Sequence, residues 1–333
     1  MAGSALAYAG VSAPLPWNQR RPDTRLHPTL GHRFAEKKEL HMPVIHAIRT
    51  GLVKVRSAQR EARSSGLSRT TDMLFDNEWT EWLPIYAWAI EHDEGVIVVD
   101  TGETSRVHER GYHPAWHPFY RRASRFSVHP DEEIGPQLRA LGIGARDVRQ
   151  VVLTHLHTDH AGGLVHLTGS RMWVAKEELH RASGMGGRIQ GYLPNRWPKF
   201  WEPEFIRFED RPEGPFQQSM PLTTRGDVLI VPTPGHTPHH VSVLVCGSPS
   251  YFLAGDTSYN QGLLLAGKVD GVSPDEAVSR GTMAKIVALA QERPLVYLPS
   301  HDPESEERLL HQSVIPGARG AMDASDVAIA AHG

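Results

Sequence analysis

The sequence predicts an α/β protein in which two β-sheets stack face to face and helices cover their outer faces. Two observations predict this fold class. Apolar segments rich in β-branched residues recur in both halves of the chain, and each half also contains segments with helical periodicity. The chain has 333 residues, of which 40% are hydrophobic and 22% are charged, so it can bury a core of this kind.

The first half begins with strands. Three are expected, each rich in β-branched or aromatic residues between turn signals: 46–55, 83–91 and 95–100. A helix is expected at 131–141, because Ile134, Leu138 and Leu141 recur at helical spacing and acidic residues occupy its first turn. A short buried strand at 148–153 follows this helix.

The second half repeats this order. A strand at 172–175 leads into a helix at 176–182, after which 184–221 shows no regular periodicity. A long helix is expected at 274–291, with Ser273 as its N-cap. The remaining strands are expected at 228–231, 241–246, 251–253 and 296–298.

The domain organisation follows from these elements. Residues 1–38 are interpreted as a loosely ordered N-terminal extension, and 39–333 as a single domain with an irregular insertion at about 184–221. The single cysteine, Cys246, rules out an intrachain disulfide and is interpreted as a buried strand thiol.

Charge and hydropathy exclude several classes of partner. The net charge of −3 argues against a nucleic acid or an anionic membrane, since both select for a basic face. No apolar run approaches the roughly 18 residues that a spanning helix needs. The stretch 1–16 has no basic residue before its apolar part, which makes it a poor secretory signal. A cytoplasmic location is therefore expected.

The most informative segment follows the strand at 148–153. Within six residues it places His155, His157, Asp159 and His160. Packing does not explain three imidazoles and a carboxylate in so short a stretch. Neutral imidazole and carboxylate together are ligands of zinc and of neighbouring first-row metals. The segment therefore predicts a metal site.

Three more residues of this type lie just beyond apolar strands, where a rigid scaffold can aim a loop side chain: His236, Asp256 and His301. With the cluster they make seven candidate ligands, five histidines and two aspartates. One zinc site closes with about four ligands, or three and a water, so the full set suits two ions bridged by a carboxylate and a hydroxide. His239 and His240 are nearby alternatives of the same residue type.

These residues, in this order, resemble the signature of the metallo-β-lactamase superfamily. The match runs from about 44 to 311 and consists of His-Leu-His-Thr-Asp-His at 155–160, Gly-His at 235–236, Gly-Asp at 255–256, and His301. The resemblance implies an αββα sandwich of two mixed β-sheets flanked by helices, with the site at one edge of the sheets.

The resemblance also implies roles for the candidate ligands. In the family, the first ion is held by the counterparts of His155, His157 and His236. The second ion is held by the counterparts of Asp159, His160 and His301. The counterpart of Asp256 bridges the two ions. Asp100 resembles the structural acid that braces the metal loops, and it is not expected to be a ligand.

Tyr259 points to the reaction. It stands three residues after Asp256, where a short turn can let its phenol donate to a carbonyl oxygen that gains charge. This spacing resembles the N-acyl homoserine lactone lactonases, in which a tyrosine at this place contacts the substrate. In that subgroup the counterpart of Asp159 protonates the leaving alkoxide. Residue 158 is Thr, where some of these lactonases carry a bulky aromatic, so one wall of the acyl pocket is expected to differ.

Two segments, 113–126 and 184–205, are longer than a minimal version of this fold needs. Their aromatic residues suit the rim of a pocket for an acyl chain. They suit a cover over the core or a dimer contact equally well, and both interpretations stay open at this stage.

The leading hypothesis is a dinuclear metal-dependent hydrolase that opens the lactone ring of N-acyl homoserine lactones, a quorum-quenching activity, by attack of a metal-bridging hydroxide. Zinc is the first choice for the two divalent ions, and iron, cobalt or manganese are alternatives, because His/Asp sites accept several metals. The expected partners are a small acyl lactone and a second copy of the chain in a homodimer, with no nucleic acid and no membrane.

Other functions are alternatives. A phosphotriesterase resembling methyl parathion hydrolase shares the same seven ligands, and a thioesterase of the glyoxalase II type is the next candidate. From a different class, a di-iron oxygen reductase usually has glutamate at the second ligand, where this chain has His157. A mononuclear iron dioxygenase would bind one ion per chain.

Overall fold

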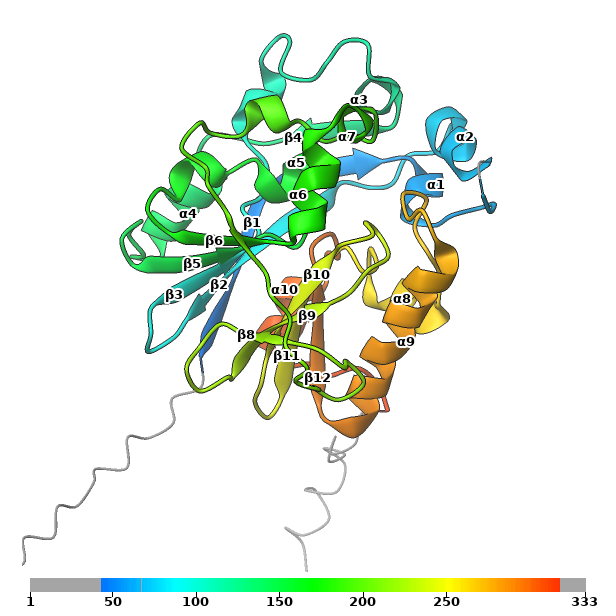
Figure 1. The fold of residues 1–333 in the computed structure, drawn as a ribbon. Coiled ribbons are helices and arrows are strands. Elements are labelled where there is room, and N and C mark those ends of the chain that lie inside the picture. The colour runs from blue at the N-terminus through cyan, green and yellow to red at the C-terminus, as the bar shows by residue number, and fades with distance from the viewer. Residues whose placement is uncertain (1–42, 67, 318–333) are drawn as a thin grey trace, which may run out of the picture. The chain divides into compact units, whose positions relative to one another are not determined.

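The computed structural model describes residues 43–66 and 68–317 (Figure 1). The predicted N-terminal extension at 1–38 lies outside the described residues, and the domain boundaries stay a prediction. Among the described helices, none is both long enough and apolar enough to cross a membrane.

The first sheet of the described chain is mixed and has seven strands in the order β4-β1-β2-β3-β5-β6-β7. The strands are β1 (Val44–Val55), β2 (Leu83–Glu91), β3 (Val96–Val99), β4 (Ser124–Ser127), β5 (Val148–Val152), β6 (Arg171–Val174) and β7 (Glu204–Phe205). Neighbouring strands from β4 to β3 pair antiparallel, and those from β3 to β7 pair parallel. The carboxyl ends of β3 and β5 therefore lie at the same edge of the sheet.

The second sheet, within the same described residues, has five strands in the order β12-β11-β10-β9-β8. The strands are β8 (Met220–Pro221), β9 (Val228–Pro232), β10 (Val241–Val245), β11 (Ser250–Gly255) and β12 (Leu295–Pro299). β9 and β11 both run antiparallel to β10, and β12 runs parallel to β11. The carboxyl ends of β9, β11 and β12 therefore point the same way.

Helices connect and flank the strands. The α-helices are α1 (Ser57–Arg60), α2 (Ser68–Phe75), α3 (Pro118–Arg122), α4 (Ile134–Ala140), α5 (Thr158–Ala161), α6 (Lys176–Ser183), α7 (Met185–Ile189), α8 (Gln261–Ala266), α9 (Glu276–Glu292) and α10 (Ser305–Leu310). Short 3-10 turns occur at η1 (Ser105–His108), η2 (Leu164–His166) and η3 (Pro194–Arg196).

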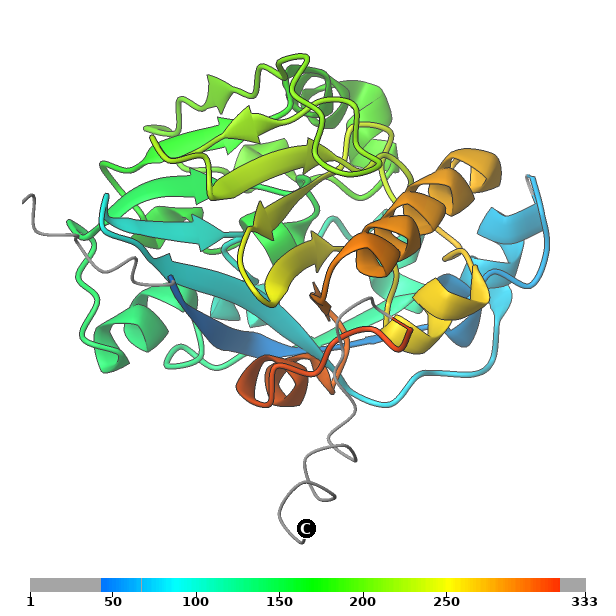
Figure 2. The ribbon, with the colours of Figure 1, turned by 90° about the horizontal axis from the view of Figure 1, so that it is seen from below.

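Apolar clusters show how the layers stack. Along β3, Val99 packs with Val243 in the cluster between the two sheets, whereas Val98 packs with Leu138 of α4 on the outer face. Successive strand residues face opposite sides, which is why a strand covered on both faces is apolar throughout. Ile286 of α9 belongs to a third cluster on the outer face of the second sheet, and Figures 1 and 2 show α9 (orange) outside that sheet. The predicted αββα sandwich is confirmed.

Every strand and helix that the sequence predicts is present, but two helix starts differ. The helix predicted at 131–141 begins at Ile134, because Pro136 fits the first turn of a helix and not its interior. The helix predicted at 274–291 begins at Glu276, and the predicted N-cap Ser273 is wrong. The Asp275 carboxylate caps α9 by accepting from two backbone N–H groups, while the Ser273 hydroxyl donates to Asp270.

Short elements escaped the sequence analysis. Helices such as α1 and α3 and the edge strand β4 span only four or five residues, too few for periodicity to show. The irregular stretch at 184–221 contains only such short elements, α7, η3, β7 and β8. Cys246 lies one residue beyond β10 and is half-buried, and this burial raises the pKa of its thiol to about 11.

Asp275→Ala should destabilise the protein by about 1 kcal/mol, because two N–H groups at the start of α9 lose their acceptor. Chemical denaturation of the two proteins measures the difference. Gln291→Ala, in the exposed last turn of the same helix, is the matched control and should change stability by less than about 0.5 kcal/mol. Equal stability of the two variants would contradict the cap.

Candidate metal centre

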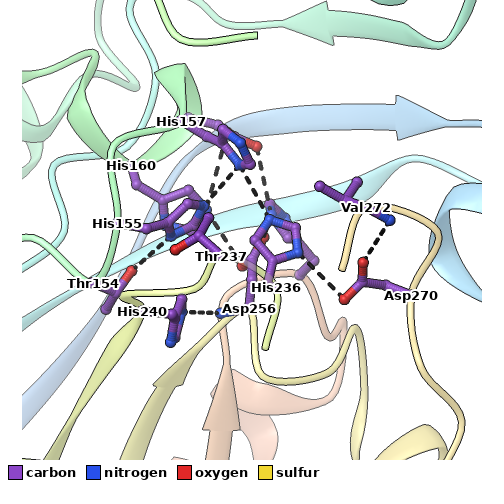
Figure 3. Close-up of polar contacts among 12 residues, drawn as sticks. Thr154, His155, His157, His160, His236, Thr237, His240, Asp256, Asp270 and Val272 are labelled. Carbon is purple, nitrogen blue, oxygen red and sulfur yellow. Dashed lines mark hydrogen bonds and ion pairs between the residues drawn. The ribbon is translucent and has the colours of Figure 1, made fainter. Parts of the chain in front are cut away.

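The predicted ligands gather at one edge of the two sheets, beyond the carboxyl ends of strands (Figure 3). The four that follow β5 lie in the loop from Thr154 and in α5. His236 follows β9, Asp256 follows β11 directly, and His301 lies two residues beyond β12. Because these strands are hydrogen-bonded within rigid sheets, loops that are distant in sequence deliver their side chains to one place.

The first group contains three histidines. His155 Nε2 lies 3.0 Å from His157 Nδ1, and His157 Nδ1 lies 3.1 Å from His236 Nε2. One ring nitrogen of each residue falls within 4.8 Å of the other two. His155 and His236 are buried, which leaves these nitrogens facing one another and not water.

The second group contains Asp159, His160 and His301, whose ligand atoms also lie within 4.8 Å of one another. His301 Nε2 is 3.5 Å from Asp159 Oδ2, and His160 Nε2 is 4.0 Å from Asp159 Oδ1. The Asp159 side chain is 16% exposed, whereas the His160 side chain is fully buried. Asp159 is therefore the member of this group that solvent can reach.

Asp256 lies between the two groups. Its Oδ1 is 3.3 Å from His160 Nε2, and its Oδ2 is 3.4 Å from both His236 Nε2 and His301 Nε2. One carboxylate thus contacts histidines of both groups, which is the place expected of a bridging ligand. The structure brings all seven predicted ligands together.

Partners behind the rings orient three of the histidines. Two of the contacts are hydrogen bonds, His160 Nδ1 with Asp100 Oδ2 at 2.8 Å and His301 Nδ1 with the Pro84 carbonyl at 2.9 Å. In the third, Asp270 Oδ2 lies 3.3 Å from His236 Nδ1, which is close enough for an ion pair but lacks hydrogen-bond geometry. An acceptor on one ring nitrogen fixes the tautomer, so that the other nitrogen presents its lone pair. In each of these rings Nε2 is the atom that faces Asp256.

Asp100 is placed as the sequence predicts. Its carboxylate accepts from the Thr154 N–H at 2.8 Å and from the Thr154 hydroxyl at 2.9 Å, as well as from His160. Its backbone has a φ of +59°, a left-handed conformation that is costly for a residue other than glycine. Asp100 thus ties the end of β3 to the loop after β5 and lies outside the ligand groups.

Burial and charge set the protonation of the cluster. Burial lowers the pKa of His155 and His157 well below the usual range, and the neighbouring histidines lower it further. Burial by itself would raise the pKa of Asp256, but His301, His160 and His236 outweigh it and hold that pKa well below the usual range. His155 and His157 therefore stay neutral and Asp256 stays ionised, which are the forms that bind metals. Burial is outweighed at His160, His236 and His301, where neighbouring carboxylates raise the pKa, so a metal would displace protons from these three rings.

The donor set fits a divalent cation. His160 Nε2 and Asp256 Oδ1 are buried and make no hydrogen bond within the described part of the chain. Unpaired buried polar atoms cost free energy, and these two face each other inside a cluster of imidazoles and carboxylates. A divalent ion would satisfy both atoms, and this combination of nitrogen and oxygen donors suits zinc and its neighbours.

His240, one of the nearby alternatives, has another role. Its Nε2 accepts a hydrogen bond from the Asp256 N–H at 3.1 Å, and its Nδ1 lies 2.9 Å from the Thr233 hydroxyl. Burial lowers the pKa of His240 to about 3, so the ring remains a neutral acceptor. His240 holds the backbone of Asp256 from behind, and neither it nor His239 belongs to a ligand group of the described residues.

Two carboxylates were missed by the sequence analysis. Asp270 lies behind His236, and the buried Glu178 of α6 accepts from the Leu156 N–H at 3.3 Å and from the Thr237 hydroxyl at 3.0 Å. Glu178 thus ties together the loops that carry the first group. Neither residue stands beside a motif in the sequence, so no local signal could have identified it.

Tyr259 lies beside the second group. Its ring stacks on His301, with the ring centroids 5.4 Å apart and the planes at 26°. The side chain is only 4% exposed, and it packs against apolar residues of β1 and β2. Tyr259 therefore contributes to the local core and also reaches the candidate metal centre.

A cavity of about 640 Å³ opens onto this centre. Its lining includes Asp159, Asp256 and Tyr259, together with Thr158. The apolar part of its wall comes from β1, α2, α3 and β4, with Val53, Val55, Met73, Leu74, Pro118, Phe119 and Phe126. Residues from both of the long segments therefore line the cavity, including His117 to Tyr120 of the first and Ile189 to Tyr192 of the second. This location supports the interpretation of these residues as a pocket rim.

Comparison with known families agrees with this geometry. The family described as the metallo-beta-lactamase superfamily matches residues 80–301 of this chain. The matched range covers more than half of the chain and contains all seven candidate ligands. The chain belongs to the metallo-β-lactamase superfamily. The family predicted from the sequence is confirmed.

Curated members of the superfamily include similar proteins. A probable metallo-hydrolase of Mycobacterium tuberculosis is 30% identical over 184 residues, which are 53% of this chain and 57% of that protein. The match therefore spans little more than half the length of that relative. The N-acyl homoserine lactonase AiiA of Bacillus thuringiensis subsp. kurstaki is 28% identical over 239 residues, which are 68% of this chain and 84% of AiiA.

Solved structures of other proteins share the fold. An N-acyl homoserine lactone hydrolase, with the product N-hexanoyl-L-homoserine bound at its catalytic metal centre, matches with a TM-score of 0.64 and 20% identity. That match covers 80% of this chain and 95% of the other. The dizinc quorum-quenching lactonase AidC matches with a TM-score of 0.51 and 13% identity, over 78% of this chain and 87% of AidC. At these identities the likeness shows the fold alone.

Asp270→Asn should weaken metal binding roughly ten- to a hundredfold, because His236 loses the carboxylate that orients its ring. Competition with a chromophoric chelator measures the affinity. Asp210→Asn changes an exposed aspartate that belongs to no candidate ligand group; it is the matched control and should bind metal as the parent protein does. If Asp270→Asn binds metal with unchanged affinity, Asp270 does not support metal binding through His236.

Proposed function

We propose that this protein is a metal-dependent hydrolase that opens the lactone ring of N-acyl homoserine lactones. The observation that carries the proposal is the shared cavity, in which Tyr259 and Asp159 line the same space as the candidate metal centre and an apolar wall faces them. The sequence similarity to the lactonase AiiA supports the same substrate class.

We further propose that the centre holds two divalent cations, with zinc the first choice. His155, His157 and His236 would hold one ion, and Asp159, His160 and His301 would hold the other. Asp256, which contacts histidines of both groups, would bind both ions. When bound, such a pair supplies an activated water and polarises the carbonyl oxygen that the water attacks.

The protein's own side chains then complete the reaction. The phenol of Tyr259 donates a hydrogen bond to the lactone carbonyl oxygen as that oxygen gains negative charge. Asp159, at the exposed side of the cluster, accepts the proton that the attacking water loses and passes it to the alkoxide oxygen released when the ring opens. Both residues line the cavity from which the substrate would enter.

The apolar wall suits the acyl chain. Met73 and Leu74 of α2 and Phe119 of α3 lie in the same lining as the candidate ligands. Burying an alkyl chain against such residues contributes about 0.8 kcal/mol per methylene group. An acyl lactone thus matches the cavity at both ends, with a polar ring at the centre and an alkyl chain along the wall.

The remaining expectations keep their status as predictions. A small-molecule substrate suits a cavity of about 640 Å³, and a net charge of −3 argues against a nucleic-acid partner. The homodimer and the cytoplasmic location are proposals from the sequence.

A substrate panel tests the proposal. Purified protein, loaded with zinc and with its metals counted, is assayed on N-acyl homoserine lactones of increasing acyl length, a phosphotriester and a glutathione thioester. We expect two ions per chain and the highest kcat/KM on the lactones. A higher kcat/KM on the phosphotriester or the thioester would replace the lactonase by one of the two alternatives, and a single ion per chain would exclude the dinuclear centre.

Asp256→Ala and His157→Ala should each abolish lactone opening, because the centre loses a group that contacts its neighbours at 3.0 to 3.4 Å. Activity is measured together with metal content. His239→Ala removes a nearby histidine outside the ligand groups and should keep both. Retention of more than about 5% of activity with full metal content in either ligand variant would contradict the roles proposed here.

Tyr259→Phe should lower kcat roughly ten- to a hundredfold with unchanged metal content, because one donor to the developing oxyanion is lost. Steady-state kinetics on a homoserine lactone measures the effect. Tyr251→Phe, on the second sheet and outside the cavity lining, is the control and should keep the parent rate. Equal rates for Tyr259→Phe and the parent protein would assign Tyr259 to packing alone.

A further inference from the structure

A buried glutamine contacts the phenol of Tyr259. Gln59 lies in α1, 5% exposed, and its Nε2 donates a hydrogen bond to the Tyr259 oxygen at 3.0 Å. The two residues are 200 positions apart in the sequence, and both line the cavity beside the candidate metal centre. The contact therefore joins the cavity wall formed by α1 to the turn that follows Asp256.

The direction of this hydrogen bond determines what the phenol can do. An amide nitrogen can only donate, so the Tyr259 oxygen is the acceptor. Within the described part of the chain, that oxygen makes no other hydrogen bond. The phenolic proton is therefore free for a group that enters the cavity. The hydrogen bond from Gln59 also restricts the directions in which the Tyr259 O–H can point.

The position of Gln59 is set by its backbone. The Gln59 carbonyl accepts from the Gly271 N–H at 2.7 Å, and the Val269 carbonyl accepts from the Ala62 N–H at 2.8 Å. A Cβ on Gly271 would lie 2.4 Å from the Ala58 carbonyl oxygen and 3.0 Å from the Gln59 Cα. Only glycine lets this loop approach α1 so closely, and the loop fixes the helix against the cavity.

The same loop reaches the candidate metal centre. Asp270, between Val269 and Gly271, is the residue whose carboxylate lies 3.3 Å from His236 Nδ1. A single short segment thus positions a candidate ligand on one side and the helix that carries Gln59 on the other. The loop at 269–271 therefore contacts both the helix that carries Gln59 and the ring of His236.

Core packing alone does not explain a glutamine at this buried position. Gln59 Oε1 is buried and has no hydrogen-bond partner within the described residues. Leaving a buried acceptor unpaired is costly, and a leucine or methionine would fill the same volume without that cost. The hydrogen bond to Tyr259 is an interaction that the amide makes and that a leucine or methionine could not.

We propose that Gln59 is a positioning residue, which holds the Tyr259 phenol with its proton directed toward the carbonyl oxygen of the substrate. The inference rests on the proposed lactonase function and adds to it the group that makes Tyr259 a donor. Gln59 acts through Tyr259 and contributes to kcat, because the hydrogen bond to the carbonyl strengthens as that oxygen gains charge.

Reversal of the hydrogen bond tests the proposal. In Gln59→Glu the ionised carboxylate can only accept. The Tyr259 O–H therefore donates to this carboxylate and no longer to the substrate. We expect kcat on a homoserine lactone to fall roughly ten- to a hundredfold, as in Tyr259→Phe, with little change in KM. Gln59→Leu, which removes the contact without reversing it, should fall by a smaller factor, roughly three- to tenfold.

The decisive measurement is a double-mutant cycle. In a Tyr259→Phe background, neither change at Gln59 should lower kcat further, since the phenolic proton is already absent. Gln190→Glu adds the same charge at an exposed residue of the cavity rim, at the end of α7, and measures the effect of a charge near the cavity without a contact to Tyr259. Metal content and thermal melting of every variant confirm that the site and the fold are intact.

Three results would overturn the inference: an unchanged kcat in Gln59→Glu, losses that multiply in full with Tyr259→Phe, or an equal loss in Gln190→Glu. The parent protein separates this failure from that of the proposed function. If the zinc-loaded parent protein opens no lactone, both the proposed function and the role of Gln59 are wrong. If the parent is active and Gln59→Glu is unaffected, only the role of Gln59 is wrong.

Discussion

The burial of the Asp256 carboxylate among histidines is the interaction on which the rest of the site depends. The residue is 4% exposed, and a buried carboxylate is costly unless positive or hydrogen-bonding groups surround it. His160, His236 and His301 place ring nitrogens within 3.4 Å of it, each from a different segment of the chain, and they hold its pKa well below the usual range. The charge can stay in the interior only while all three segments keep their places, and this requirement links the site to the sheets.

The sheets and the groups behind the rings meet that requirement. Asp100 at the end of β3, the Pro84 carbonyl in β2 and Asp270 in the loop before α9 each hold one histidine. The loop with Asp270 also packs against α1, where Gly271 allows the approach that places Gln59 on the Tyr259 phenol. Preorganised groups of this kind avoid reorganisation during the reaction, which is where electrostatic catalysis gains its advantage.

Most of the fold could be predicted because its strands are local patterns. β2 coincides with the expected strand at 83–91. Eight of its nine residues are buried, and such a strand appears in the sequence as a nearly continuous apolar run that needs no information from elsewhere. The start of α9 was predicted less accurately than the bounds of β2. Ser273 and Asp275 are both good caps, and the choice fell to Asp275 because Asp270 engages the Ser273 hydroxyl. Short helices such as α1 form where neighbouring segments hold them, so their own sequence carries little signal.

The sequence by itself determined the family, the layered architecture and the identity of the candidate ligands, because clustered imidazoles and carboxylates at strand ends are a chemical pattern that survives without coordinates. Only the tertiary structure decided which groups stand behind those ligands. Asp270 contacts a residue 34 positions away, and Glu178 contacts residues 22 and 59 positions away. Gln59 contacts a residue 200 positions away. Contacts between residues so far apart in sequence form only when the folded sheets bring distant loops to one edge. No local pattern in the sequence predicts them.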